Sequence, residues 1–198
     1  MSKSKNVRTL DAIQKVMGRR LKNEGFRNKG RTFNREADDG IVHVIDLQMG
    51  RRGLRGEFIP NFGVFIADFH EVEQGSRPSF PKEAQCELRD RIDNNTDWWS
   101  LKKDNADTAK KIIAKLEKEA LPLFQRIRSN QDVIQAWKED GRDLLRRGGF
   151  VIGVLEALRG NRHESQKWFS EELAHTDHKG YKNHVREVAE RVGIHLES

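Results

Sequence analysis

The fold of this chain is decided by residues 97–124, DWWSLKKDNADTAKKIIAKLEKEALPLF, because the spacing of apolar residues changes within them. Before Trp99 apolar and polar residues alternate, whereas after it the apolar residues recur every three or four positions. The second spacing places one apolar stripe along an α-helix. We therefore predict a long amphipathic helix over residues 105–124, bent at Pro122 because proline cannot donate the helical hydrogen bond.

Upstream of this change, the patterns are typical of one helix followed by strands. Apolar residues at helical spacing predict a helix over residues 8–24, with cations on its other face. Pro60 suggests that the strand containing it lies at a sheet edge or has a bulge. Runs that alternate or are rich in β-branched residues predict strands near 32–36, 41–49, 57–67 and 85–92.

These elements predict an α+β fold, in which an antiparallel sheet packs one face against the helices and is followed by a helical C-terminal part. We expect an α+β domain over residues 1–128 and a helical region over 129–198, which could pack on the first domain as one unit. The helical region contains a helix pair that turns at Gly160-Asn161. One core should contain Phe26, Phe33, Phe62, Val64, Leu88, Ile112, Ile113 and Leu116.

The stretch GFRNKGRTFNRE, residues 25–36, interleaves basic residues with two phenylalanines across a glycine turn. This composition suits a nucleic-acid platform of cations and stacking rings. It also suits a hairpin with Phe26 and Phe33 directed into the core and the cations in water. We favour the hairpin because a turn around Asn28-Lys29-Gly30 places one ring on each arm.

Five segments together resemble a bacterial domain of unknown function, the family numbered 4304, over residues of about 8–125. The resemblance rests on Gly25 to Gly30, Asp46-Leu47-Gln48, Asn61 to Phe65, Cys86 to Arg91, and Trp98-Trp99. Pro60 departs from the β-branched or apolar residue expected there. The family has no established activity, so the resemblance implies a fold and no catalytic residues, with the remaining C-terminal residues as a helical extension.

Composition limits the setting of the protein. The single Cys86 excludes an internal disulfide, and no apolar run approaches the ~20 residues that span a bilayer. The N-terminal cations are not followed by the apolar core of a signal peptide. We therefore expect a cytoplasmic protein. The net charge of +6 is uneven, since residues 1–60 contain 14 Lys and Arg against 7 Asp and Glu.

Signatures of catalysis and of metal binding are weak. The histidines near the C-terminus, His175, His178 and His184, lie beside Asp177, but no cysteine assists them and we expect solvated side chains rather than a zinc site. The nucleophile elbow, the phosphate loop and the paired-histidine zinc motif are all missing from the sequence. We expect no metal, no cofactor and no enzymatic activity.

The candidate ligand-binding residues are polar side chains that should lie on the sheet face opposite the helices. They are Asp46, Gln48, Asn61, Arg89 and Arg91. One interpretation is a structural ladder, in which Asp46 pairs with Arg89 or Arg91 across strands. The other is a polar surface whose two arginines bind a carboxylate or phosphate of a partner.

Two classes of function follow from these observations. The favoured one is a non-catalytic binding or accessory protein whose partner is a protein, and an immunity-like role fits by analogy of size and class. The alternative is a nucleic-acid-binding protein that uses the basic first 60 residues. No membrane partner is expected. The candidate residues for nucleic acid are Arg27, Lys29, Arg31, Arg35, Arg51, Arg52 and Arg55.

Overall fold

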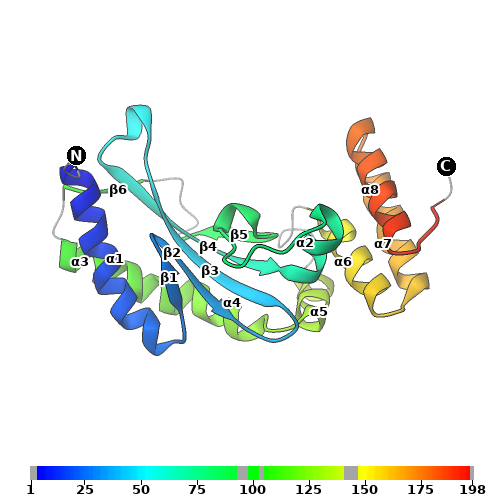
Figure 1. Ribbon diagram of the computed structural model, residues 1–198, viewed down its shortest axis with the longest axis horizontal. Coiled ribbons are helices and arrows are strands. Elements are labelled where there is room, and N and C mark those ends of the chain that lie inside the picture. The colour runs from blue at the N-terminus through cyan, green and yellow to red at the C-terminus, as the bar shows by residue number, and fades with distance from the viewer. Residues whose placement is uncertain (1–3, 93–97, 103–104, 141–146, 197–198) are drawn as a thin grey trace. The chain divides into compact units, whose positions relative to one another are not determined.

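Helix, strands and then helices follow one another in the computed structural model, which describes residues 4–92, 98–102, 105–140 and 147–196 (Figure 1). The chain divides into two compact units. The first contains Met1–Ala37, Val42–Phe65 and Phe80–Arg126. The second contains Asp38–Ile41, Ile66–Ser79 and Ile127–Ser198, and so includes a segment that the sequence analysis grouped with the sheet.

Within the described residues, six strands form one antiparallel sheet in the order β1-β2-β3-β4-β5, and β6 also pairs with β4. The predicted α+β class is therefore confirmed. Phe33 of β2 lies opposite Asn28 of β1 on one side and opposite Ile45 of β3 on the other. The strands are β1 (Arg27–Lys29), β2 (Thr32–Glu36), β3 (Ile41–Met49), β4 (Glu57–Ile66), β5 (Leu88–Arg91) and β6 (Trp99–Ser100).

Pro60 lies inside the sheet and not on an edge strand, contrary to one expectation from the sequence. β4 pairs with β6 up to Phe58 and with β5 from Asn61, so Pro60 falls between the two partners. Its carbonyl accepts a hydrogen bond from the Ile92 amide at 3.1 Å. The proline nitrogen faces the same side of the strand, toward Ile92, and cannot donate the second hydrogen bond of this pair, so the regular ladder with β5 ends at Arg91.

Helices of the first unit cover one face of the sheet. They are α1 (Lys5–Asn23), α3 (Asn105–Lys115) and α4 (Leu121–Arg126), with the π-helical turn η3 (Leu116–Ala120) between the last two. The π turn ends two residues before Pro122, which cannot donate to the carbonyl four residues back and whose ring crowds that carbonyl. A local widening of the helix therefore lies next to the proline at which the sequence predicted a bend.

Phe124 of α4 is the centre of the first unit's core. Its ring stacks on His43 with 4.5 Å between centroids and lies 6.0 Å from Phe26 and 6.1 Å from Phe62. The predicted core is confirmed for every member except Ile113, which is only half-buried. Ile112 and Leu116 point into the core, and Ile113 lies at the edge of that stripe beside Arg20 and Glu117.

The second unit is helical. The predicted turn at Gly160-Asn161 joins α6 to α7, and Gly160 has a φ of +81° that suits glycine. Gly153 of α6 lets the Phe169 ring approach closely, since a Cβ there would lie 3.0 Å from it. The sequence analysis did not predict α2, and it placed the first residue of this helix in the strand over 57–67. The helices are α2 (Ala67–Gln74), α5 (Asn130–Asp140), α6 (Gly148–Leu158), α7 (Arg162–Ala174) and α8 (Lys179–Arg191).

Candidate functional site

The candidate site lies where α1 meets the β1–β2 hairpin. Ser4 accepts a hydrogen bond from the Val7 amide at 3.4 Å and begins α1. The apolar stripe of this helix, Leu10, Ile13, Met17 and Leu21, is buried against the sheet. Its opposite face therefore points to water, and it carries exposed cations at helical spacing: Lys15, Arg19 and Lys22.

The hairpin places further cations beside this helix. Lys29 lies opposite Thr32, and the turn between them contains Gly30 with a φ of +62°. The Asn28 amide donates to the Gly30 carbonyl at 3.3 Å and supports the turn. Phe33 points inward and is 1% exposed, close to Gly18 of α1. The rings are thus in the core, as expected, and the hairpin tip is left to polar side chains.

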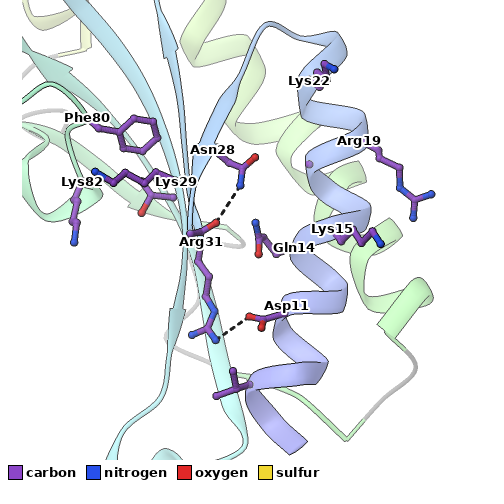
Figure 2. Close-up of a pocket in the computed structure, with 14 residues that line it drawn as sticks. Asp11, Gln14, Lys15, Arg19, Lys22, Asn28, Lys29, Arg31, Phe80 and Lys82 are labelled. Carbon is purple, nitrogen blue, oxygen red and sulfur yellow. Dashed lines mark hydrogen bonds and ion pairs between the residues drawn. The ribbon is translucent and has the colours of Figure 1, made fainter. Parts of the chain in front are cut away.

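A groove of about 1090 Å³ follows the junction between α1, the hairpin and residues 80–82. In Figure 2 the hairpin stands between the α1 side chains on one side and Phe80 and Lys82 on the other. The lining contains six cations and one carboxylate, Asp11. We call this surface the basic groove, and its cations are Lys15, Arg19, Lys22, Lys29, Arg31 and Lys82.

Most charges of the basic groove are unpaired. Arg31 forms an ion pair with Asp11 at 3.2 Å, and each of these side chains is about a quarter exposed. The other five cations form no ion pair within the described residues. Unpaired cations that share one concave surface create a positive potential that favours an anionic ligand. The basic groove is therefore an anion-binding candidate by charge and by shape.

The seven residues that the sequence analysis proposed for nucleic acid are divided among four places. Lys29 and Arg31 line the basic groove. Arg27 pairs with Glu36 at 2.5 Å, with both side chains exposed. Arg35 is held internally, because its guanidinium contacts His43 at 3.2 Å and covers the Phe26 ring at 4.9 Å. The remaining three lie at the turn between β3 and β4: Arg51, Arg52 and Arg55.

Four cations of the basic groove were missed by sequence reasoning. Lys15, Arg19 and Lys22 are spaced at i, i+4 and i+7, a signal that places them on one face of the helix. Whether these side chains lie beside the hairpin depends on how α1 packs on the sheet, and the spacing of residues along the helix does not show this. Lys82 lies in a segment without periodic pattern, so no signal in the sequence joined it to the others.

The polar sheet face contains the other proposed residues, but part of it is covered. The Pro81 carbonyl accepts a hydrogen bond from the buried Asn34 amide at 2.9 Å, and Cys86 lies directly over Gly63. Residues 80–87 therefore pack on this face. Glu83, which is 8% exposed, forms an ion pair with Arg89 at 2.7 Å.

Asp46 pairs with neither of the two arginines that the structural interpretation offered. Its carboxylate accepts a hydrogen bond from the Thr32 hydroxyl at 2.7 Å. Burial raises the pKa of Asp46, although this hydrogen bond opposes the shift. The Asn61 amide donates to Gln48 at 3.1 Å on the same face. Arg91 lies opposite Asn61 and is exposed, so the five residues share a face without converging on one site.

A second group of charges is buried in the second unit. Glu73 of α2, whose side chain is 6% exposed, accepts hydrogen bonds from Arg147 and, at 3.0 Å, from His184 of α8. The Arg147 guanidinium also lies over the rings of Phe69 and Phe150 at 5.4 and 5.3 Å. Burial would raise the pKa of Glu73, but Arg147 and His184 outweigh it and lower that pKa. These contacts tie three helices together.

Other chemistry is not favoured by the described side chains. No group of three His, Cys, Asp or Glu residues among them is arranged to hold a metal ion. Cys86 is 5% exposed, and burial raises the pKa of its thiol well above the ordinary value, which keeps it protonated. None of the described helices has both the length and the apolar character of a membrane span.

Comparison with known families gives one match. The model of a family described as a domain of unknown function, DUF4304, matches residues 17–126, which is more than half of the 198 residues. The matched region contains the sheet and most of the basic groove, including Arg19, Lys22, Lys29, Arg31 and Lys82. No curated protein and no solved structure matches the chain.

Proposed function

We propose a function for this chain, which belongs to the DUF4304 family of domains of unknown function: it binds nucleic acid through the basic groove, without catalysis. The observation that carries the proposal is the charge of that groove, six cations against one carboxylate. Five of the cations form no ion pair within the described residues, so binding a phosphate would break no existing pair.

The chemistry of the lining supports phosphate contacts rather than a reaction. Lysine and arginine bind phosphate oxygens, and the amides of Gln14 and Asn28 can donate to them as well. The single carboxylate, Asp11, is already paired with Arg31. We assign no catalytic residue. The proposal retains the expectation of a bacterial, cytoplasmic setting, in which nucleic acid is an abundant polyanion.

The protein partner favoured by the sequence has less support from the geometry. One surface considered for it was the helical C-terminal part, and the other was the polar sheet face with Arg89 and Arg91. Residues 80–87 pack on part of this face, and Glu83 already holds Arg89. We therefore locate the proposed ligand at the basic groove. An acidic protein surface is the other partner that suits this charge, and it serves as a competitor in the test.

The test measures the affinity of the full chain for labelled nucleic acid by fluorescence anisotropy. Duplex and single-stranded oligonucleotides of about 25 residues span a typical interface. The variant Lys15→Gln/Arg19→Gln/Lys22→Gln removes three unpaired cations of the basic groove. We expect it to bind at least about tenfold more weakly than the wild type.

A matched control distinguishes the loss of groove residues from the loss of total positive charge. Lys102, Lys110 and Lys111 are exposed residues of the same unit that do not line the groove. The variant Lys102→Gln/Lys110→Gln/Lys111→Gln loses the same charge and should bind like the wild type. Equal weakening of both variants, or a wild type that binds an acidic polypeptide better than any nucleic acid, would contradict the proposal.

A further inference from the structure

The turn between β3 and β4 carries a second group of cations, outside the basic groove. Residues 50–56 have the sequence GRRGLRG, and Arg51, Arg52 and Arg55 are exposed. None of the three forms an ion pair within the described residues. Leu54 lies among them with 37% of its surface exposed, an unusual exposure for a large apolar side chain in the described chain. We call residues 51–55 the arginine tip.

Backbone hydrogen bonds hold the arginine tip in one conformation. The Leu54 amide donates to the Arg51 carbonyl at 3.1 Å, and the Gly50 amide donates to the Glu57 carbonyl at 2.9 Å. The chain folds back so closely that a Cβ on Gly50 would lie 2.3 Å from the Leu54 carbonyl oxygen. The arginines are therefore displayed by an ordered turn, which lowers the entropy lost when a partner binds.

Arg52 has a backbone conformation that costs stability. Its φ of 54° lies in the left-handed region, which glycine adopts more easily than arginine. Its neighbour Gly53 does not have a positive φ, and a Cβ there would meet nothing within 4 Å. An arginine thus occupies the strained position and the glycine the unstrained one. Such conformations concentrate at functional sites, where the side chain has a use that offsets the strain.

We propose that the arginine tip enters the minor groove of duplex DNA, with its arginines along the groove and Leu54 against a base step. This inference rests on the proposed function and names its ligand. The minor groove of B-form DNA is about 6 Å wide, and its negative potential attracts arginine most strongly where A·T pairs narrow it. Gly53 adds no side chain to the turn, and leucine is one of the apolar wedges used in the minor groove.

The arginine tip and the basic groove belong to the same unit and are joined by Arg31. The Arg31 guanidinium lies 4.0 Å from the sulfur of Met49, two residues before the tip, and the Arg31 carbonyl accepts a hydrogen bond from the Leu47 amide at 3.2 Å. The same guanidinium pairs with Asp11 in the basic groove. Phosphate contacts in the basic groove could therefore position a duplex whose minor groove meets the arginine tip.

An anionic membrane is another surface to which a basic turn with an exposed leucine could bind. Membrane attachment needs a broad apolar face or an acyl chain besides basic residues. The arginine tip offers one leucine, about a third exposed, and its cations are arginines with planar donors rather than lysines. These features favour DNA, so vesicles become one arm of the test.

The test compares four probes with the full chain. They are an A·T-rich DNA duplex, a G·C-rich DNA duplex of the same length, a duplex RNA, and vesicles of neutral lipid with phosphatidylserine. We expect the A·T-rich duplex to bind at least about fivefold more tightly than the G·C-rich one. Duplex RNA should also bind more weakly, because its minor groove is wide and shallow.

Three variants test whether the preference comes from the arginine tip. Arg51→Gln/Arg52→Gln/Arg55→Gln should lose the A·T preference, whereas Lys102→Gln/Lys110→Gln/Lys111→Gln, with the same loss of charge, should keep it. Leu54→Ala should keep the preference but bend the duplex less, as measured by energy transfer between dyes at its two ends. Unchanged thermal unfolding of each variant shows that the fold is intact.

The outcomes separate this inference from the proposed function. If the wild type binds DNA but the arginine variant keeps the full A·T preference, the inference is wrong and the proposed function stands. If the wild type binds no nucleic acid, both are wrong. If the arginine variant loses vesicle binding while its DNA binding is unchanged, the arginine tip is a membrane contact and the inference is overturned.

Discussion

The cations of the two units differ in what surrounds them. In the basic groove, Lys15, Arg19 and Lys22 are exposed and form no ion pair within the described residues. In the second unit, Arg147 is held by the buried Glu73 and lies over two phenylalanine rings. The first group has little to lose by binding a partner, whereas the second is already used to hold helices together. Pairing and burial, rather than the number of cations, indicate where a ligand can bind.

The largest expected effect comes from breaking the buried pair by removing one of its two partners. Arg147→Met should lower the free energy of unfolding by about 3 kcal/mol, because it leaves the Glu73 carboxylate buried with only His184 to compensate it. Arg19→Met, in the basic groove, should change it by less than about 0.5 kcal/mol. Urea denaturation measures both.

The double variant Glu73→Met/Arg147→Met sharpens this contrast. Removing both charges leaves no uncompensated carboxylate, so it should recover a substantial part of the stability lost in Arg147→Met. Similar losses for Arg147→Met and Arg19→Met would mean that the difference between the two regions does not extend to stability.

Lowering the pH should reduce the stability of the second unit through protonation of Glu73. Because its pKa is lowered in the folded protein, the ionised carboxylate stabilises the fold above the ordinary glutamate range, and this contribution is lost as pH falls through the lowered pKa. Glu73→Gln should be less stable than the wild type at pH 7, and the difference should shrink below about pH 4. A difference that does not vary with pH would contradict this account of Glu73.

Asp46 in the first unit should respond in the opposite direction. Its pKa is raised, so the ionised form costs stability above the ordinary aspartate range and this cost disappears as pH falls. Asp46→Asn keeps an oxygen for the Thr32 hydroxyl and should stabilise the protein at pH 7 by up to about 1 kcal/mol. The gain should vanish near pH 3, and a loss of stability at pH 7 would count against it.

The sequence predicted the elements of the fold better than the surfaces they create. The change of apolar spacing after Trp99 correctly separated strands from helices, and Phe26 and Phe33 are buried as the hairpin required. α2 was missed because β4 ends in the apolar Phe65 and Ile66, and no glycine or proline separates them from Ala67, where the helix begins. Ile113 was misplaced because two adjacent isoleucines leave the centre of a helical stripe ambiguous.

The candidate site was only partly predictable for a similar reason. Lys29 and Arg31 were proposed from composition, and they do line the basic groove. The cations of α1 were seen as a solvated helix face, because a helix pattern does not show which strand lies beside it. The cover over the polar sheet face comes from residues 80–87, which contain one proline and mostly polar residues. The sequence pattern placed residues 85–87 in a strand, whereas β5 begins at Leu88.

A smaller change in the free energy of unfolding is expected from a substitution in the arginine tip. Arg52→Gly should raise the free energy of unfolding by about 0.5–1 kcal/mol, because glycine adopts the positive φ without steric cost. The same variant should bind DNA more weakly. A variant that is less stable and binds equally well would remove the reason for an arginine at this strained position.

The dependence of DNA affinity on salt tests the central claim, that the basic groove binds phosphates, most directly. Between about 50 and 200 mM salt, log K falls by about 0.9 for each phosphate contact per unit of log salt concentration. We predict that Lys15→Gln/Arg19→Gln/Lys22→Gln makes this slope shallower by about 2–3, while Lys102→Gln/Lys110→Gln/Lys111→Gln leaves it unchanged. Identical slopes for the wild type and the groove variant would contradict the claim.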